Sequence, residues 1–195
     1  MKGLPLSDEL ARAWHEGRLT VHRRLMNPQP VDNCILHRED ADLARPIYRA
    51  WINDVPTHHF YKPPYLPGEV VYIKETWVDL IKTPVMGAGS ERYAGLKVWY
   101  RADNTPEMEV VGRYISPRFM PEWASRSHAL IVSVKPERVQ EITEEEAMEE
   151  GVGWQNTAGL ARFTARKLSR SLWETLHPGT WDANPWVWRY ELEAR

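Results

Sequence analysis

Apolar residues recur at helical spacing in three parts of the chain. A helix is predicted over residues 7–17, where Ser7 is placed to cap the first turn and Gly17 ends the apolar stripe. A short helix is predicted within 142–151, because Thr and Glu stand there at capping-box spacing and a glycine follows about two turns later. A longer one is predicted over 158–176, until the sequence His-Pro-Gly stops it.

Alternation of apolar and polar residues predicts strands between and after these helices. The predicted strands lie at 18–24, 69–77, 96–101, 109–114, 129–139 and 185–192. Seven prolines between residues 25 and 67 predict mostly ordered loop, with a weak helical pattern only at 40–51, and 87–90 reads as a flexible loop. Strands and helices without regular β-α-β alternation predict an α+β fold built around a small, mostly antiparallel barrel. We expect a single domain over 1–195 with a Pro-rich loop insertion at about 25–67.

Charge is balanced over the chain but unevenly placed along it. The 195 residues hold 25 Lys and Arg against 27 Asp and Glu, a net charge of −2, which excludes a non-specific coat for nucleic acid. Residues 137–150 contain seven Glu and a single Arg, whereas the segment from Arg162 to Arg170 is basic. These stretches predict either two solvated helix faces that attract each other or an acidic surface for a partner.

Several classes of protein and site find no support in the sequence. No run approaches the roughly 20 apolar residues of a membrane span, and the start lacks the apolar core of a secretory signal. The lone Cys34 fits a reducing compartment, so we expect a cytoplasmic protein without a membrane partner. Cys34 with His37, and the pair His58 and His59, make an incomplete zinc set, and phosphate-binding Gly-rich loops are absent, so no cofactor or metal is expected.

The strand predicted at 18–24 carries the first candidate site. Alternation separates two sets of side chains, Thr20, His22 and Arg24 on one face and Leu19, Val21 and Arg23 on the other. If the apolar set is buried, the polar set lines a cleft, where His22 and Glu150 could form an acid–base pair and Arg24 could hold a phosphate or carboxylate. The Arg23 and Arg24 pair could also face a phosphate together. The alternative is that His22 is a hydrogen-bonded structural residue and Arg24 a salt-bridged one.

Further candidates for ligand contact lie later in the chain. Lys74 and Glu75 are neighbours on a strand, so only one of them can point into a cleft, and Lys74 is the candidate phosphate contact. Trp123 and Arg126 could stack on an unpaired base. Of the ten Trp residues, packing is the expected task for four, Trp77, Trp173, Trp186 and Trp188, and Trp123 is the one to test for ligand contact.

Several segments together resemble the ASCH-domain proteins of phages and prophages. The resemblance covers most of the chain in order and rests on these segments: 17–24, 67–77, 100–103, 120–126, 138–152, 172–173 and 184–188. It implies a PUA-like pseudo-barrel with a cleft beside the first helix and strand, which related proteins use for RNA or modified bases. Small relatives include an amidohydrolase of N4-acetylcytidine, which uses Lys, Thr and Glu, and a reported ribonuclease.

The match to the family's signature is incomplete. Gly17 and Arg24 fit the pattern, but Leu19 occupies the Lys position and His22 the Glu or Thr position. Glu150 aligns with the catalytic Glu, and Thr20 stands beside the Lys position. Leu19 can supply neither a nucleophile nor a proton shuttle, which argues against the family's amidohydrolase mechanism.

Three functions follow as expectations. The first is binding of RNA or a modified nucleobase or nucleoside in a cleft lined by Thr20, His22, Arg24 and Glu150. The second is hydrolysis in the same cleft, of an acylated pyrimidine or of RNA. The third is interaction with a host protein through the acidic residues 144–150, which the balanced net charge favours modestly over general RNA binding.

Overall fold

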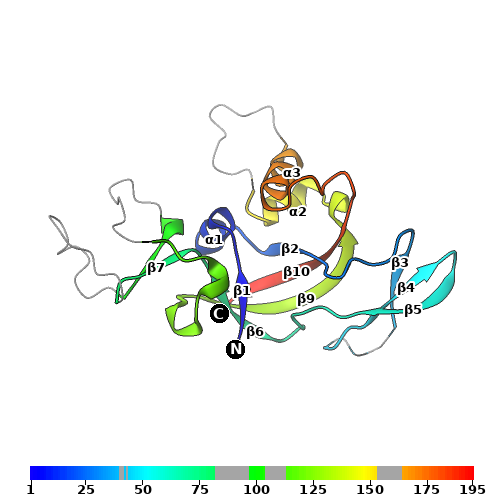
Figure 1. Cartoon of the computed structure of the whole chain (residues 1–195), viewed down its shortest axis with the longest axis horizontal. Helices are drawn as coiled ribbons and strands as arrows, with labels where there is room; N and C mark the ends of the chain where they lie inside the picture. The colour runs from blue at the N-terminus through cyan, green and yellow to red at the C-terminus, as the bar shows by residue number, and fades with distance from the viewer. Residues whose placement is uncertain (40–41, 43, 82–96, 104–112, 153–163) are drawn as a thin grey trace.

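The computed structural model describes residues 1–39, 42, 44–81, 97–103, 113–152 and 164–195, and within them the fold is mixed α+β (Figure 1). Its centre is a five-stranded sheet in the order β1-β6-β9-β10-β2. The strands are β1 (Lys2–Pro5), β6 (Val70–Lys74), β9 (His128–Arg138), β10 (Trp186–Ala194) and β2 (Val21–Leu25). β1 pairs with β6 in parallel and the other neighbours are antiparallel, so the expectation of a mostly antiparallel α+β fold holds.

The last strand is buried on both of its faces. Trp186, Trp188, Tyr190 and Leu192 alternate into the larger apolar core, as their spacing predicts. Val187, on the opposite face, packs into a second core together with residues of the helices. The sheet therefore carries apolar cores on both sides, and polar groups on β10 and its neighbour β2 must find partners inside the protein.

Within the described residues three α-helices cover this sheet, and the sequence predicts the start of the first two. They are α1 (Asp8–His15), α2 (Glu144–Glu149) and α3 (Ala165–Leu176). Ser7 Oγ accepts from the amide of Leu10, and Thr143 with Glu146 forms the predicted capping box. Residues 158–163 of the predicted third helix lie outside the described residues, and the described helix begins at Ala165. α2 and α3 lie together above β2 and β10 (Figure 1).

The Pro-rich segment 25–67 differs from its prediction as loop. It contains β3 (Ile35–Arg38), β4 (Tyr48–Ile52) and β5 (Val55–Tyr61), which form a three-stranded antiparallel sheet. The helical pattern at 40–51 was also misleading, since its described end enters β4. Asn53 and Asp54 both have positive φ, 50° and 61°, between the paired residues Ile52 and Val55, which is the geometry of a tight hairpin turn.

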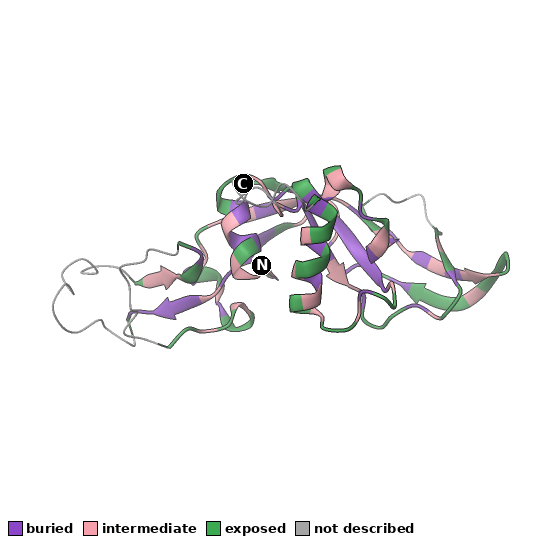
Figure 2. Cartoon of the chain, turned by 90° about the horizontal axis from the view of Figure 1, so that it is seen from above, coloured by how far each residue is buried: buried purple, intermediate pink, exposed green. Residues whose placement is uncertain are grey.

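This second sheet extends from one end of the molecule and a smaller one from the other (Figures 1 and 2). The strands of the smaller sheet are β7 (Trp77–Asp79) and β8 (Val98–Tyr100). The single strand predicted at 69–77 is thus divided between β6 and β7. The predicted loop 87–90 and most of the predicted strand 109–114 lie outside the described residues, and 113–114 are not in a strand.

Short 3-10 turns complete the described structure, at Arg101–Asp103, Pro117–Phe119, Glu122–Ala124 and Val139–Glu141. In the described part of the chain, no helix is both long and apolar enough to cross a membrane. β1, which the sequence did not predict, and β2 are the two edges of the central sheet. Their unpaired edges frame the candidate site.

Candidate functional site

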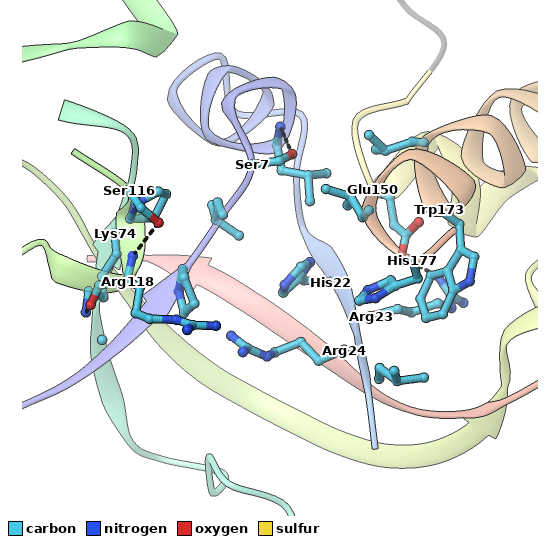
Figure 3. A pocket seen from close by; sticks show the side chains of 18 of the residues that line it. Ser7, His22, Arg23, Arg24, Lys74, Ser116, Arg118, Glu150, Trp173 and His177 are labelled. Carbon is cyan, nitrogen blue, oxygen red and sulfur yellow. Dashed lines mark hydrogen bonds and ion pairs between the residues drawn. The ribbon is translucent and has the colours of Figure 1, made fainter. Parts of the chain in front are cut away.

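A cavity of about 570 Å³ lies between the two edge strands of the central sheet (Figure 3). One side is made by β1, the first residues of α1, Lys74 and residues 116–118. The other side is made by β2, Glu150 and one face of α3. The volume is in the range of small-molecule sites, roughly 300–1,000 Å³. The cleft expected beside the first helix and the following strand is therefore present as a cavity.

β2 contributes consecutive residues to this cavity rather than alternate ones. His22 and Arg24 lie opposite Tyr190 and Trp188 of β10, and Arg23 lies opposite Arg189, so the predicted alternation of faces holds. Yet His22, Arg23 and Arg24 all line the cavity. The expectation that only one face of β2 lines the cleft is therefore wrong. β2 is an edge strand, and residues from both of its faces border the cavity.

Arg23 is the centre of a buried ion-pair network. Its guanidinium donates to Glu137 at 2.6 Å, to Glu146 at 2.5 Å and to Glu150 at 3.0 Å. Only 2% of the Arg23 side chain is exposed, and the pKa of the group is raised because its three carboxylate neighbours outweigh the effect of burial. The charge of Arg23 is thereby neutralised within the protein, which leaves it poorly placed to hold a phosphate.

The same network uses much of the acidic segment 144–150. Glu146 also pairs with Arg189 at 3.1 Å, and Glu144 accepts the backbone amide of Arg166 at 3.1 Å. The acidic segment is therefore engaged by Arg23 on β2, by Arg189 on β10 and by the backbone at the start of α3. The acidic surface considered for a host protein is correspondingly reduced.

Glu150 stands at the end of α2, against the cavity wall. Burial raises its pKa, although Arg23 and a hydrogen bond from Ser169 Oγ at 3.1 Å act in the opposite direction. An antiparallel bridge joins Glu150 to Leu19, which is itself 2% exposed. Leu19 is thus a core residue, while Glu150 reaches the cavity.

His22 is buried and neutral. Burial lowers its pKa to about 3, and the positive charges of Arg24 and Arg23 and the nearby His177 add to this effect. The expected acid–base pair of His22 with Glu150 is not formed. His22 does not titrate near neutral pH, and Glu150 is bonded to Arg23 and Ser169 instead. Within the described residues, the ring of His22 forms no hydrogen bond, and it points into the cavity (Figure 3).

Three cationic side chains line the cavity, Arg24 on the β2 wall and Lys74 and Arg118 on the opposite wall. Arg24 lies over the ring of Tyr65, 5.6 Å from its centre, with Nη1 3.5 Å from the hydroxyl. Lys74 Nζ donates to the carbonyl oxygen of Arg118 at 2.7 Å. Among the described residues, none of Arg24, Lys74 and Arg118 is paired with a carboxylate. The part of the cavity lining that these three side chains form is accordingly positive.

Of the neighbours Lys74 and Glu75, only Lys74 lines the cavity, as the strand pattern required. Glu75 points away and is 1% exposed, bonded to His15 and Arg126. Arg126 also pairs with Asp103, so the guanidinium predicted to stack on a base is already engaged.

The remaining sequence candidates lie away from the cavity. Trp123 is 57% exposed and contacts the ring of Trp77 edge-on, at 5.9 Å between ring centres. Thr20 is exposed just before β2, where its backbone rather than its side chain bonds to Glu149 and Leu192. Neither residue lines the cavity. The structure thus brings together Glu150, His22, Arg24, Arg23 and Lys74, and leaves out Thr20, Trp123 and Arg126.

Sequence reasoning missed several lining residues, namely Tyr65, Arg118, Ser169, Leu172, Trp173, Leu176 and His177. Those on and after α3 share one helical face through their spacing of three and four residues, a signal that was present in the predicted helix. Trp173 and His177 lie with ring centres 4.5 Å apart. Tyr65 and Arg118 carry no local signal, since only the fold brings these loop residues to the cavity.

Within the described ranges, no group of three or more His, Cys, Asp or Glu residues is placed to hold a metal ion. Comparisons of the chain with family models, with curated proteins and with solved structures give no match. The cavity and the residues that line it are therefore the features from which a function can be inferred.

Proposed function

We propose that this chain is an ASCH-like protein of the PUA-like class that binds RNA, or a modified nucleobase or nucleoside, in the cavity between β1 and β2. The observation that carries the proposal is His22, a buried neutral imidazole with no protein hydrogen bond, at the wall of a cavity of about 570 Å³. A neutral imidazole offers one donor and one acceptor. That pair complements the polar edge of a nucleobase.

The rest of the lining supports a planar, partly apolar ligand. Leu172, Trp173 and Leu176 give the α3 side an apolar wall, and Trp173 and His177 supply aromatic rings. Aromatic rings stack on unpaired bases of any sequence, with about 1–3 kcal/mol per base. Polar groups at one side and a stacking wall at the other are the requirements of a pocket for a base outside a duplex.

Equilibrium binding to a panel of unmodified and modified nucleosides and short single-stranded RNAs tests the proposal. We expect at least one member to bind, and His22→Phe, which keeps a ring of similar shape but removes both nitrogens, to weaken that binding by about tenfold. His37→Phe on β3, outside the cavity, is the matched control and leaves binding unchanged. A panel without a binder, or a His22→Phe variant that folds and binds as well as the parent, would overturn the proposal.

A second candidate, a hydrolase acting in the same cavity, is favoured by one observation, the raised pKa of Glu150. A buried carboxyl with a raised pKa is more readily protonated, and its proton can be donated to a leaving amine or oxygen. The replacement of the family Lys by the buried Leu19 argues against the family's amidohydrolase mechanism, and the low pKa of His22 argues against a His22-based ribonuclease.

Incubation with N4-acetylcytidine and with a single-stranded RNA separates the two candidates. The hydrolase predicts product with the parent protein and none with Glu150→Gln. Binding without product in both reactions leaves the first candidate as the function of the cavity.

A further inference from the structure

We infer that Arg24 and Arg118, with Lys74 beside them, form an anion subsite for a phosphate group of the ligand, so that the cavity takes a phosphorylated nucleoside, as a nucleotide or as a unit of RNA. The inference rests on the proposed function for the nucleoside part of the ligand. It adds the position and chemistry of a second recognition element.

The geometry of the subsite comes from the two separate edges of the sheet. Arg24 belongs to the edge strand β2, whereas Arg118 and Lys74 stand on the β1 side of the cavity. In Figure 3 the side chains of Arg24 and Arg118 extend toward each other across the opening. Two guanidinium groups on opposite walls can each present a fork of N–H donors to one tetrahedral anion between them.

Electrostatics within the described residues favours an anion at this position. Two like charges that face each other repel, and this repulsion is relieved when an anion lies between them. The nearby acidic side chains are already engaged elsewhere, Glu69 by Lys2 at 2.8 Å and Glu150 by Arg23 at 3.0 Å. Because these carboxylates are neutralised by other cations, the charge of the Arg24 and Arg118 pair remains available to a ligand.

Side-chain positions around Arg24 are fixed by hydrogen bonds that do not use up its charge. The Tyr65 hydroxyl donates to the Gly3 carbonyl oxygen at 2.8 Å, and Arg24 lies over the Tyr65 ring. On the other wall, Lys74 Nζ donates to the Arg118 carbonyl oxygen and so joins β6 to the loop that carries Arg118. The guanidinium of Arg24 and the backbone of Arg118 are therefore held by neighbouring residues, which reduces the entropy cost of ordering this part of the lining around a phosphate.

His22 lies two residues before Arg24 on β2 and points into the same cavity. A ligand that spans the two positions has a neutral polar group at His22 and an anionic group between Arg24 and Arg118. Nucleotides combine these two features, whereas free bases and nucleosides lack the second.

Titration with inorganic phosphate, followed by calorimetry at low and at moderate salt, tests the subsite without a nucleoside. We expect the parent protein to bind phosphate more weakly as salt rises, and Arg118→Ala and Arg24→Ala each to weaken binding by about tenfold. Arg118 is exposed, so its replacement leaves the fold intact, which a denaturation curve verifies. Arg195→Ala is the charge-matched control, because this exposed arginine pairs with Glu193 and lies outside the cavity.

Nucleosides with and without a 5′-phosphate, and a dinucleotide with an internal phosphate, form the second arm. We expect the phosphorylated member of a pair to bind about tenfold more tightly to the parent protein and equally to Arg118→Ala. A dinucleotide that gains as much as the monophosphate identifies a phosphodiester as an acceptable source of the anion.

The outcomes distinguish this inference from the proposed function. Nucleosides that bind with no gain from a phosphate, or an effect of Arg118→Ala no larger than that of Arg195→Ala, overturn the subsite and leave the nucleoside pocket standing. Phosphate that binds through Arg24 and Arg118 while no nucleoside binds supports the subsite and overturns the proposed function.

Discussion

Arg23 Nη1 donates to Glu150 Oε1 at 3.0 Å, although the two residues are 127 positions apart in the sequence. The contact joins the edge strand β2 to the end of α2, and Ser169 Oγ extends it to α3 by bonding the other oxygen of Glu150. Both residues line the cavity. The charge network therefore fixes the wall of the site, and its cations and carboxylates are already matched to one another.

Replacement of Arg23 is expected to destabilise the fold strongly. Arg23→Met retains the length and apolar part of the side chain but leaves the buried Glu150 without its cation and Glu137 with Lys135 alone. Removing one partner of a buried ion pair costs about 3–5 kcal/mol, and urea denaturation at pH 7 measures it.

Arg170→Met is the control for this prediction. Its partner Asp182 and the guanidinium itself are both exposed, so a loss of about 0–1 kcal/mol is expected. Similar losses of stability for the two variants would show that the Arg23 network is no stronger than a surface pair.

The buried His22 is expected to make stability fall as the solution becomes acidic. Its pKa is about 3 in the folded protein against 6.5 in the unfolded chain. Below pH 6.5 the unfolded chain takes up a proton at His22 that the folded protein does not. The free energy of unfolding is therefore unaffected by this group above pH 6.5 and decreases as pH falls from 6.5 toward 3. The slope is about 1.4 kcal/mol per pH unit.

Denaturation curves at pH 7, 6, 5 and 4 for the parent protein and His22→Phe measure this linkage. We expect the difference in stability between the two proteins to shift in favour of His22→Phe by about 1.4 kcal/mol for each unit between pH 6 and pH 4. His37→Phe serves as the control for loss of one histidine. Parallel pH profiles for the parent and His22→Phe would show that His22 is protonated in the folded protein.

The glycines that follow α1 and α2 provide a matched pair. Gly17 and Gly151 have nearly the same positive φ, 71° and 72°, but only Gly151 is crowded, because a Cβ there would run into the Cβ of Ala13. Alanine in this conformation costs about 1–2 kcal/mol at either position. Overpacking adds about 1–3 kcal/mol at Gly151 alone.

Thermal and urea denaturation of Gly17→Ala and Gly151→Ala measure the two costs. We expect the second variant to be the less stable by the overpacking increment, since α1 and the end of α2 cannot separate without disturbing Glu150. Equal losses would mean that the contact between Gly151 and Ala13 relaxes freely.

Local chemistry accounts for what the sequence could predict. The caps at Ser7 and Thr143 and the alternation along β9 and β10 involve neighbouring residues, so the pattern is visible before folding. β1 is four residues long and pairs in parallel with β6, and its sequence contains two residues, glycine and proline, that are rare in strands. The sheet within 25–67 was missed because its prolines masked the turn at Asn53 and Asp54.

Lining residues of the candidate site could be predicted where they follow a local pattern in the sequence. They could not be predicted where the cavity is formed by contacts between distant segments. His22, Arg24 and Glu150 were found from alternation and resemblance, whereas the pairing of Arg23 with Glu137 joins β2 to the end of β9 and has no local pattern. Arg118 belongs to the short 3-10 turn Pro117–Phe119 and reaches the cavity only through the folded chain. Contacts across long sequence separations decide which charges remain available to a ligand.

Glu75 turns away from the cavity at the end of β6. It holds α1 through His15 and the segment after the Glu122–Ala124 turn through Arg126. Its carboxylate accepts from His15 Nε2 at 3.0 Å and from Arg126 Nε and Nη2, each at 2.9 Å. Burial alone would raise the pKa of Glu75, but the hydrogen bonds from His15 and Arg126 outweigh it and lower the pKa below its usual value of 4.5. The contribution to stability is therefore present above pH 4.5 and is lost as pH falls through the lowered pKa.

Glu75→Gln keeps the shape of the side chain and removes its charge at every pH. At pH 7 we expect a loss of about 3 kcal/mol, because Arg126 loses a buried partner, and the gap to the parent narrows between pH 4.5 and pH 2 as Glu75 itself becomes protonated. Urea denaturation across this range measures the gap, with the exposed Glu193→Gln as the control. A gap of the same size at pH 7 and pH 2 would mean that the carboxylate of Glu75 contributes through packing alone and that its charge does not hold α1 in place.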